Sequence, residues 1–310
     1  MPLSEETALS YEHVTKRFGS ITALSDVSFE IYRGEIFGLI SPDGSGKTTL
    51  IRIAMGIINP DEGECRLLGS TDRKKARSHA GYVSQRFGLY PDLTVIENAL
   101  LFGSLYGASH ETTIAKAEEI LGRTGLLPFK DRPAAKLSGG MKQKLALATG
   151  LLHTPKILFL DEPTTGVDPV ARREFWAMLY ELNASEGLTI VVSTPYMDEA
   201  ALCSRKMFLS KGRLLDIGTT EELVSRYPHR IFKLEYADRR AKPALLACDG
   251  VVDANMFGSN YHIAVSDAEA AQNSIKRHFE AKGAAFPGMT ELTPALEDLF
   301  VAFAGGDGEK

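Results

Sequence analysis

The sequence predicts an α/β protein with a parallel sheet flanked by helices, followed by a smaller α+β domain. The uninterrupted apolar run at residues 157–160 is typical of a strand buried on both faces of a parallel sheet, and residues 189–194 show another buried-strand pattern. A glycine-rich loop also separates a third apolar run from a helical pattern. Finally, the composition breaks at Tyr227-Pro228-His229, so we expect domains at residues 1–228 and 229–310.

The glycine-rich loop at residues 41–49 is close to the phosphate-binding pattern G-x-x-x-x-G-K-[ST]. Gly44 and Gly46 allow backbone N–H groups to turn inward around phosphates. Lys47 reaches the β- and γ-phosphate oxygens, and Thr48 offers its hydroxyl to Mg²⁺. A glycine-rich turn without a ligand is the alternative for this motif alone. The candidate nucleotide-binding residues here are Ser41, Pro42, Asp43, Gly44, Ser45, Gly46, Lys47, Thr48 and Thr49.

Ser41 occupies the position of the first glycine in this pattern. Glycine tolerates strained backbone conformations because it has no Cβ. We therefore expect the Cβ of Ser41 to distort the bend of the loop.

Two carboxylates, Asp161 and Glu162, follow the apolar run at residues 157–160. At the carboxyl end of a buried strand, Asp161 would lie beside the phosphate loop and hold Mg²⁺ directly or through water. Glu162 is placed to polarise an attacking water molecule. The alternative is that both acids only solvate a loop.

A second turn of small residues, Ser138-Gly139-Gly140, leads into a helical pattern. Free backbone N–H groups and a hydroxyl at a helix N-terminus form a second candidate anion site. Two phosphate-binding surfaces in one chain, for one nucleotide, need an explanation.

Taken in order, these motifs resemble those of the ATP-binding cassette (ABC) ATPases, over roughly residues 8–225. The resemblance implies a head-to-tail dimer, in which ATP lies between the phosphate loop of one chain and the Ser-Gly-Gly turn of the other. The second cassette is then the same chain or a paralogue, and dimerisation depends on ATP. The residues that carry the resemblance are Phe18, Lys47, Thr48, Gln85, Ser138, Gly139, Gly140, Asp161, Glu162 and Asp168.

The resemblance also assigns roles to single residues. Phe18 resembles the aromatic residue that stacks on adenine, with a core phenylalanine as the alternative. Gln85 resembles the glutamine that senses Mg²⁺ and links to the transmembrane partner; otherwise it is a surface amide. Asp168 resembles the aspartate that touches the opposite phosphate loop, although Asp-Pro also opens ordinary turns. The implied catalytic residues are Glu162, Gln85 and Lys47, and the implied metal ligands are Thr48, Gln85 and Asp161.

Pro195 departs from the family pattern, which has a histidine at this position to hydrogen-bond the γ-phosphate. Proline has neither a side-chain donor nor a backbone N–H. Loss of one preorganised donor costs on the order of 10²- to 10³-fold in turnover. We therefore expect good MgATP binding and slow hydrolysis. In an asymmetric pair, such a chain would be a regulatory subunit; alternatively, Glu162 suffices and a homodimer turns over slowly.

The formal net charge is −5, and the basic residues are scattered, so nucleic-acid binding is poorly supported. Three cysteines at unrelated spacings suggest neither disulfides nor a metal site, which fits a reducing cytoplasm. The sequence shows neither a signal peptide nor an apolar stretch approaching the ~20 residues that cross a bilayer. If the chain drives transport, a separate transmembrane permease must provide the pathway, with this chain on the inner face of the membrane.

A helical subdomain is expected at about residues 86–150. Phe87, Leu89 and Tyr90 follow Gln85 and are candidates for docking a permease, because aromatic residues are enriched at interface cores. Packing inside the subdomain is the alternative for each of them.

The tail predicts strand 231–236, helix 243–248, a hairpin of 251–257 and 261–265, a helix from Asp267 to Ala281, and a strand at 286–292. That order predicts a ferredoxin-like α+β unit. A last amphipathic helix opens at Thr293-Pro294.

The ending Pro-Ala-Leu-Glu-Asp-Leu-Phe at residues 294–300 resembles the drug-export branch of the family, similar to daunorubicin-resistance ATPases paired with type-2 exporter permeases. Other segments resemble the first cassette of tandem two-cassette exporters. Multidrug export is the expected process. The alternative is a soluble cassette protein that acts on ribosomes or DNA. Cassette proteins of that kind carry two cassettes in one chain or long coiled-coil insertions.

Overall fold

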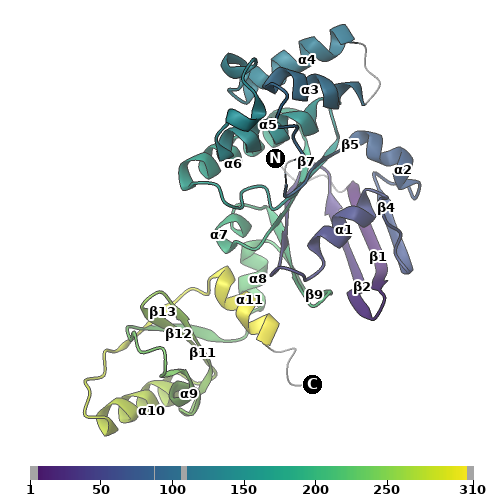
Figure 1. Ribbon diagram of the computed structural model, residues 1–310. Coiled ribbons are helices and arrows are strands. Elements are labelled where there is room, and N and C mark those ends of the chain that lie inside the picture. The colour runs from purple at the N-terminus through teal and green to yellow at the C-terminus, as the bar shows by residue number, and fades with distance from the viewer. Residues whose placement is uncertain (1–5, 87, 106–109, 306–310) are drawn as a thin grey trace. The chain divides into compact units, whose positions relative to one another are not determined.

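The computed structural model describes residues 6–86, 88–105 and 110–305 (Figure 1). The chain divides into two compact units, Met1–Ile217 and Gly218–Lys310. This division precedes the boundary that we expected after residue 228, because helix α8 (Thr220–Arg226) contacts helix α11 (Leu296–Gly305) of the second unit.

The first unit contains a six-stranded sheet in the order β5-β6-β7-β3-β8-β9. Its first five strands are linked by parallel pairing. A separate antiparallel sheet has the order β2-β1-β4. The strands are β1 (Thr7–Phe18), β2 (Ile21–Tyr32), β3 (Ile36–Ile40), β4 (Glu62–Leu67), β5 (Ala80–Val83), β6 (Ile157–Asp161), β7 (Thr189–Thr194), β8 (Arg205–Ser210) and β9 (Arg213–Gly218).

The parallel sheet is buried on both faces. Every residue of β6 and β7 is buried, which confirms the prediction from their apolar runs. Successive side chains of a strand point to opposite faces. Accordingly, Leu158 and Leu160 belong to one apolar cluster, whereas Ile157 and Phe159 belong to the other.

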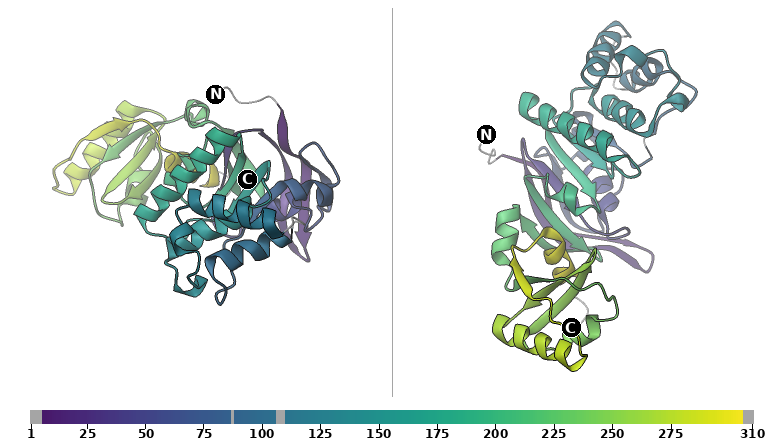
Figure 2. Two further views of the ribbon diagram at one scale, coloured as in Figure 1. Left: turned by 90° about the horizontal axis from the view of Figure 1, so that it is seen from above. Right: turned by 90° about the vertical axis from the view of Figure 1, so that its left-hand side faces the viewer.

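Helices α3, α4, α5 and α6 pack on one face of the parallel sheet, and α1 together with the antiparallel sheet packs on the other. Figures 1 and 2 show α3 and α4 grouped at one end of the first unit, where both also contact α5. A capping box between Thr94 and Glu97 begins α3. This group is the helical subdomain that the sequence predicts. The helices of the unit are α1 (Lys47–Ala54), α2 (Arg73–Ala76), α3 (Val95–Ser104), α4 (His110–Arg123), α5 (Gly139–Leu151), α6 (Pro169–Glu186) and α7 (Met197–Ala200).

The second unit has an antiparallel sheet in the order β11-β12-β10-β13. Helices α9 and α10 contribute to the same apolar cluster as the inner strands. The order of elements and of strands confirms the predicted ferredoxin-like unit. The final strand starts later than predicted, although Phe286 still packs against the cluster. The elements are β10 (Arg230–Leu234), α9 (Lys242–Leu246), β11 (Val251–Phe257), β12 (Asn260–Val265), α10 (Ala268–Ala281) and β13 (Met289–Leu292).

Candidate nucleotide-binding site

The loop at residues 41–49 joins β3 to α1, so it lies at the carboxyl end of a central parallel strand. Gly44 and Gly46 have φ angles of 77° and 112°, in the region that favours glycine. At Gly46, a Cβ would also lie 2.7 Å from the carbonyl oxygen of Ala23. The loop therefore needs glycine at position 46 for both its conformation and its close packing.

Ser41 does not distort the loop, so that expectation was wrong. It is not among the described residues with positive φ, and its buried side chain fits beside Pro42, whose carbonyl oxygen accepts from Ser41 Oγ at 3.2 Å. Lys47 Nζ donates to the carbonyl oxygens of Ser41 and Pro42 at 2.8 and 3.2 Å. The Lys47 side chain thus folds back over the phosphate loop and binds the backbone of its first two residues.

Asp161 lies at the end of β6, beside the first turn of α1. Its Oδ2 accepts a hydrogen bond from Thr48 Oγ1 at 2.9 Å, and its Oδ1 accepts one from Ser193 Oγ at 2.6 Å. The Tyr82 hydroxyl lies 3.4 Å from Oδ2. Burial, followed by the charge of Asp161, raises the pKa of Tyr82 to about 12, so that hydroxyl stays protonated and can donate.

Glu162 has a φ angle of 48°, which is uncommon for a residue with a Cβ. Its backbone N–H donates to the carbonyl oxygen of Ser193 at 3.0 Å, which holds this conformation. Oε1 of Glu162 lies 3.3 Å from Lys47 Nζ, and Oε2 accepts from Gln85 Nε2 at 2.8 Å. Strained backbone of this kind is concentrated at functional sites. With a side chain only 10% exposed, Glu162 does not merely solvate a loop.

Lys47, Thr48 and Glu162 line a hollow that is open to solvent and encloses about 410 Å³ of empty space. The donor set also suits Mg²⁺, which prefers hard oxygen ligands, because the Thr48 hydroxyl and the Asp161 carboxylate are adjacent. The pocket is lined by Ala23, Gly44, Ser45, Gly46, Lys47, Thr48, Thr49 and Glu162.

Phe18 is 48% exposed, so the alternative of a core phenylalanine was wrong. It ends β1 and pairs with Ile21 across the turn to β2, the strand that also carries Ala23 of the pocket. Lys16 Nζ lies 5.5 Å from the centre of the Phe18 ring. An exposed ring on this hairpin is accessible to a planar ligand, and adenine stacking stays a prediction.

Ser138 and Asp168 do not line the pocket. Each is the N-cap of a helix: Ser138 Oγ accepts from Met141 N at 3.3 Å, and Asp168 Oδ1 accepts from Val170 N and Ala171 N at 3.0 Å. The two helix starts are neighbours, because a Cβ at Gly140 would lie 2.7 Å from the Cβ of Ala171. The structure therefore groups these residues away from the phosphate loop of their own chain.

Pro195 follows the end of β7, next to the carboxylates. The hydroxyl groups beside it are already engaged: Ser193 donates to Asp161, and Thr194 Oγ1 donates to Glu199 Oε2 at 2.7 Å. Both hydroxyls therefore bond to carboxylates of the same chain.

Sequence reasoning missed two residues of this site, Ser193 and Tyr82. Ser193 is fully buried and touches both the side chain of Asp161 and the backbone of Glu162. The sequence did offer a signal for Ser193. It is a polar residue near the carboxyl end of the apolar strand β7, which pairs with β6, the strand that ends in the two carboxylates.

The residues that we predicted to dock a permease differ in how exposed their side chains are. Tyr90 is 53% exposed, whereas Leu89 is partly buried and packs against the apolar cluster of the helical subdomain. Phe87 lies outside the described residues. Of the three, Tyr90 is the side chain shown to be accessible to a partner.

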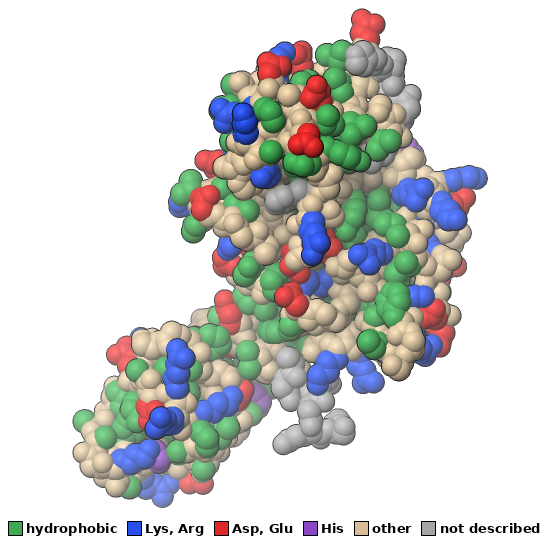
Figure 3. Space-filling view, in the orientation of Figure 1, with side chains coloured by type: hydrophobic (Ala, Val, Ile, Leu, Met, Phe, Trp, Pro, Cys, Tyr) green, Lys and Arg blue, Asp and Glu red, His purple; other side chains and the backbone are tan. Residues whose placement is uncertain are grey.

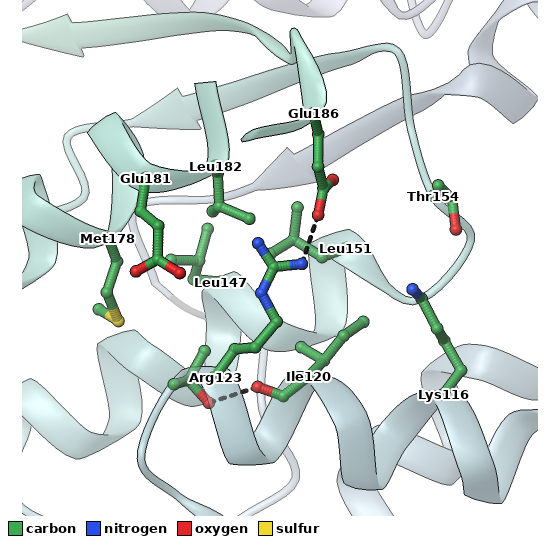
Figure 4. Close-up of a pocket in the computed structure, with 11 residues that line it drawn as sticks. Lys116, Ile120, Arg123, Leu147, Leu151, Thr154, Met178, Glu181, Leu182 and Glu186 are labelled. Carbon is green, nitrogen blue, oxygen red and sulfur yellow. Dashed lines mark hydrogen bonds and ion pairs between the residues drawn. The ribbon is translucent and has the colours of Figure 1, made fainter. Parts of the chain in front are cut away.

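A second hollow, with about 440 Å³ of empty volume, lies between α4, α5 and α6 (Figure 4). Its floor is apolar and includes Leu147 and Leu182, and Arg123 of α4 crosses it to form an ion pair with Glu186 of α6. No residue singled out in the sequence lines this hollow.

The surface in Figure 3 carries acidic and basic side chains interspersed on both units. Within the described parts of the chain, no helix combines the length and the apolar character that crossing a membrane requires.

The family model described as "ABC transporter" matches residues 24–165. The probable multidrug ABC transporter ATP-binding protein YbhF of Escherichia coli K12 is 38% identical over 311 residues, which cover 98% of this chain and 53% of that protein. This chain thus spans about half the length of that relative. The Nod factor export ATP-binding protein I of Ralstonia nicotianae is 39% identical over 303 residues, or 96% of this chain and 94% of that protein.

Solved structures agree. The ATP-binding cassette MJ0796, in a dimeric post-hydrolysis state bound to ADP and Pi, has a TM-score of 0.62 and 30% identity, covering 68% of this chain and 98% of that one. The cbiO1 protein of Clostridium perfringens, part of the transporter complex cbiONQ, has a TM-score of 0.66 and 28% identity, covering 72% of this chain and 92% of that one. The phosphate loop, the paired carboxylates and these relatives together place the chain in the ATP-binding cassette (ABC) transporter family, as an ATPase cassette.

Proposed function

We propose that this chain binds MgATP at the pocket described above, hydrolyses it, and drives a separate membrane permease of the exporter type. The observation that supports this most is the convergence of five side chains from three segments: Lys47 and Thr48 on α1, Gln85 after β5, and Asp161 and Glu162 at the end of β6.

Each of these groups has a distinct task. The charge of Lys47, now balanced by Glu162 at 3.3 Å, is available to phosphate oxygens. Thr48 and Asp161 would hold Mg²⁺, which when bound neutralises charge on the phosphates. Glu162 accepts the proton of an attacking water, and Gln85 orients Glu162 through its amide.

Hydrolysis in this proposal requires a second cassette. Ser138 and Asp168 lie together at neighbouring helix starts, away from their own phosphate loop. Facing a partner's loop, the N-terminus of α5 would present backbone N–H groups to the partner's phosphates. The dimeric relative MJ0796 supports this arrangement.

Pro195 predicts slow turnover at this chain's own site. Proline supplies no donor, and the neighbouring Ser193 and Thr194 hydroxyls bond to carboxylates of the same chain. This observation also favours a second candidate function, in which the chain is a hydrolysis-poor regulatory subunit whose Ser138 turn completes the active site of a different cassette.

We further propose that the cargo is a drug-like compound or another amphipathic product, exported by a permease that selects it. Similar proteins include the multidrug protein YbhF and the linearmycin resistance protein LnrL of Bacillus subtilis, the latter 35% identical over 222 residues. In this proposal the chain works on the cytoplasmic face of the membrane, with exposed Tyr90 at the permease contact.

The steady-state ATPase rate of the purified chain, measured against protein concentration, tests the proposal. A rate that rises more than linearly and vanishes in Glu162→Gln means a working homodimer. Negligible turnover with intact MgATP binding favours the regulatory alternative. Absence of MgATP binding would refute both functions.

A further inference from the structure

Glu199, on α7, is a carboxylate buried to 1% exposure that touches two separate segments of the first unit. Its Oε1 accepts a hydrogen bond from Thr164 Oγ1, and its Oε2 accepts one from Thr194 Oγ1 at 2.7 Å. Thr164 belongs to residues 163–168, the loop that follows Glu162. One buried side chain therefore joins that loop to the end of β7.

Arg172, on α6, supplies the opposite charge. Its Nε lies 3.5 Å from Glu199 Oε1, and its Nη1 donates to Asp198 Oδ2 at 3.1 Å. The guanidinium also lies over the ring of Tyr196, 4.9 Å from its centre. Because a buried carboxylate is costly unless it is paired and hydrogen-bonded, these contacts compensate for the burial of the Glu199 side chain and hold it in place.

The two segments that meet at Glu199 belong to different parts of the proposed reaction. The loop 163–168 begins directly after Glu162 and ends at Asp168. Residues 194–196, which we name the switch segment, contain Pro195. On the other side, the fully buried Gln143 of α5 donates from Nε2 to the carbonyl oxygen of Pro163. The loop 163–168 is therefore also bonded to α5, the helix that begins at the Ser-Gly-Gly turn.

We propose that Glu199 is a positioning residue that couples the loop 163–168 to the switch segment, so that a displacement of either one by nucleotide or by a partner cassette is passed to the other. Glu199 itself contacts no nucleotide and acts through the hydroxyls of Thr164 and Thr194. The inference rests on the proposed function, because it names how that site is regulated.

Hydrogen exchange of the full chain without nucleotide tests the coupling in both directions. Thr194→Val does not touch the loop, yet amide exchange in residues 163–168 should rise about tenfold, as expected for loss of one hydrogen bond to a charged group. Thr164→Val should raise exchange in residues 194–200 by a similar factor, since coupling between two sites is reciprocal. Glu199→Ala should raise both. Glu199→Gln should raise them less, because an amide oxygen still accepts from one hydroxyl.

Thr189→Val is the matched control. Thr189 is 1% exposed at the other end of β7, and its Oγ1 accepts from Gly34 N at 3.0 Å, so the variant also loses one buried hydrogen bond. It should leave exchange in both segments within twofold of wild type. Equal effects in this control, or effects confined to the segment that carries each substitution, would overturn the coupling.

A second arm adds a non-hydrolysable ATP analogue with Mg²⁺. The analogue should slow amide exchange of residues 41–49 in every variant. The inference is supported if exchange of residues 163–168 and 194–200 changes together in wild type but not in Thr164→Val. Protection of residues 41–49 with identical responses in Thr164→Val and wild type refutes the coupling alone. No protection of residues 41–49 in wild type refutes the proposed function, and the nucleotide-free exchange then still decides whether the two segments are coupled.

Discussion

Replacing Asn98 by leucine should cost the first unit about 3 kcal/mol of stability. Asn98 is fully buried near the start of α3. Its Nδ2 lies 3.0, 3.2 and 2.9 Å from the carbonyl oxygens of Tyr90, Leu93 and Thr94, and its Oδ1 accepts from Tyr90 N at 2.9 Å. This one side chain therefore fixes the segment that follows Gln85.

The magnitude follows from the hydrogen bonds. The side-chain amide of Asn98 has two N–H donors, which three carbonyl oxygens share, and its oxygen accepts one bond. The four contacts therefore count as three full hydrogen bonds. Leucine has a similar volume and removes the Oδ1 partner of Tyr90 N, whereas the carbonyl oxygens of Tyr90, Leu93 and Thr94 each still accept from a backbone N–H. At about 1 kcal/mol for each lost bond, and more where a buried group stays unsatisfied, the sum is about 3 kcal/mol.

Urea unfolding followed by the fluorescence of Trp176 measures this effect. Trp176 is the single tryptophan of the chain, is 2% exposed, and belongs to the same apolar cluster as Val95 and Ala99 on α3. The midpoint should fall while the slope m stays constant. Asn59→Leu is the control, because exposed Asn59 accepts one bond from Arg73 and should lose less than about 1 kcal/mol. A loss below about 1 kcal/mol for Asn98→Leu, or one equal to the control, would refute the reasoning.

Three further predictions concern the site and the core. Pro195→His should raise kcat on the order of 10²-fold by restoring a donor, with little change in the Kd for MgATP; an unchanged or lower rate would contradict the role given to Pro195. Thr48→Val should weaken ATP binding in the presence of Mg²⁺ far more than in its absence, which titration with and without a chelator measures. Burial raises the pKa of Cys65 and Cys203 to about 12 and also raises that of Cys248, so iodoacetamide at pH 8 should label all three only in urea, as mass spectrometry of native and unfolded samples would show.

Local chemistry made much of the site predictable. The phosphate loop is continuous in sequence, so its residues could be named without a structure. Asp161 and Glu162 were predictable because parallel strands present their carboxyl ends at one edge of the sheet, where β3 also ends. The ferredoxin-like order of the second unit followed in the same way from alternating strand and helix patterns.

The parts that sequence reasoning missed depend on backbone angles or on contacts between distant residues. The effect of Ser41 was predicted wrongly because a glycine is required where φ is positive or where no space is left for a Cβ, and the pattern contains neither the angle nor the space. Ser193 meets Glu162, and Glu199 meets Thr164, over 31 and 35 positions of the sequence. Periodicity does not identify these contacts, and only the packing of β7 against β6 brings Ser193 to Glu162.

The residues around Pro195 indicate that proline at this position removes one hydrogen-bond donor without disrupting the rest of the site. Thr194 and Tyr196 on either side keep their contacts, because Thr194 bonds to Glu199 and the backbone N–H of Tyr196 donates to Thr194 Oγ1 at 3.1 Å. The backbone and side-chain contacts on both sides of residue 195 are therefore in place, and the proposed loss is confined to the side chain at that position. If hydrolysis depends on that side chain while nucleotide-driven movement depends on the framework, Pro195→His should change kcat and leave the coupling through Glu199 unaltered. On the proposed function, such a chain would pass nucleotide occupancy to a partner cassette through Glu199 while its own hydrolysis is slow.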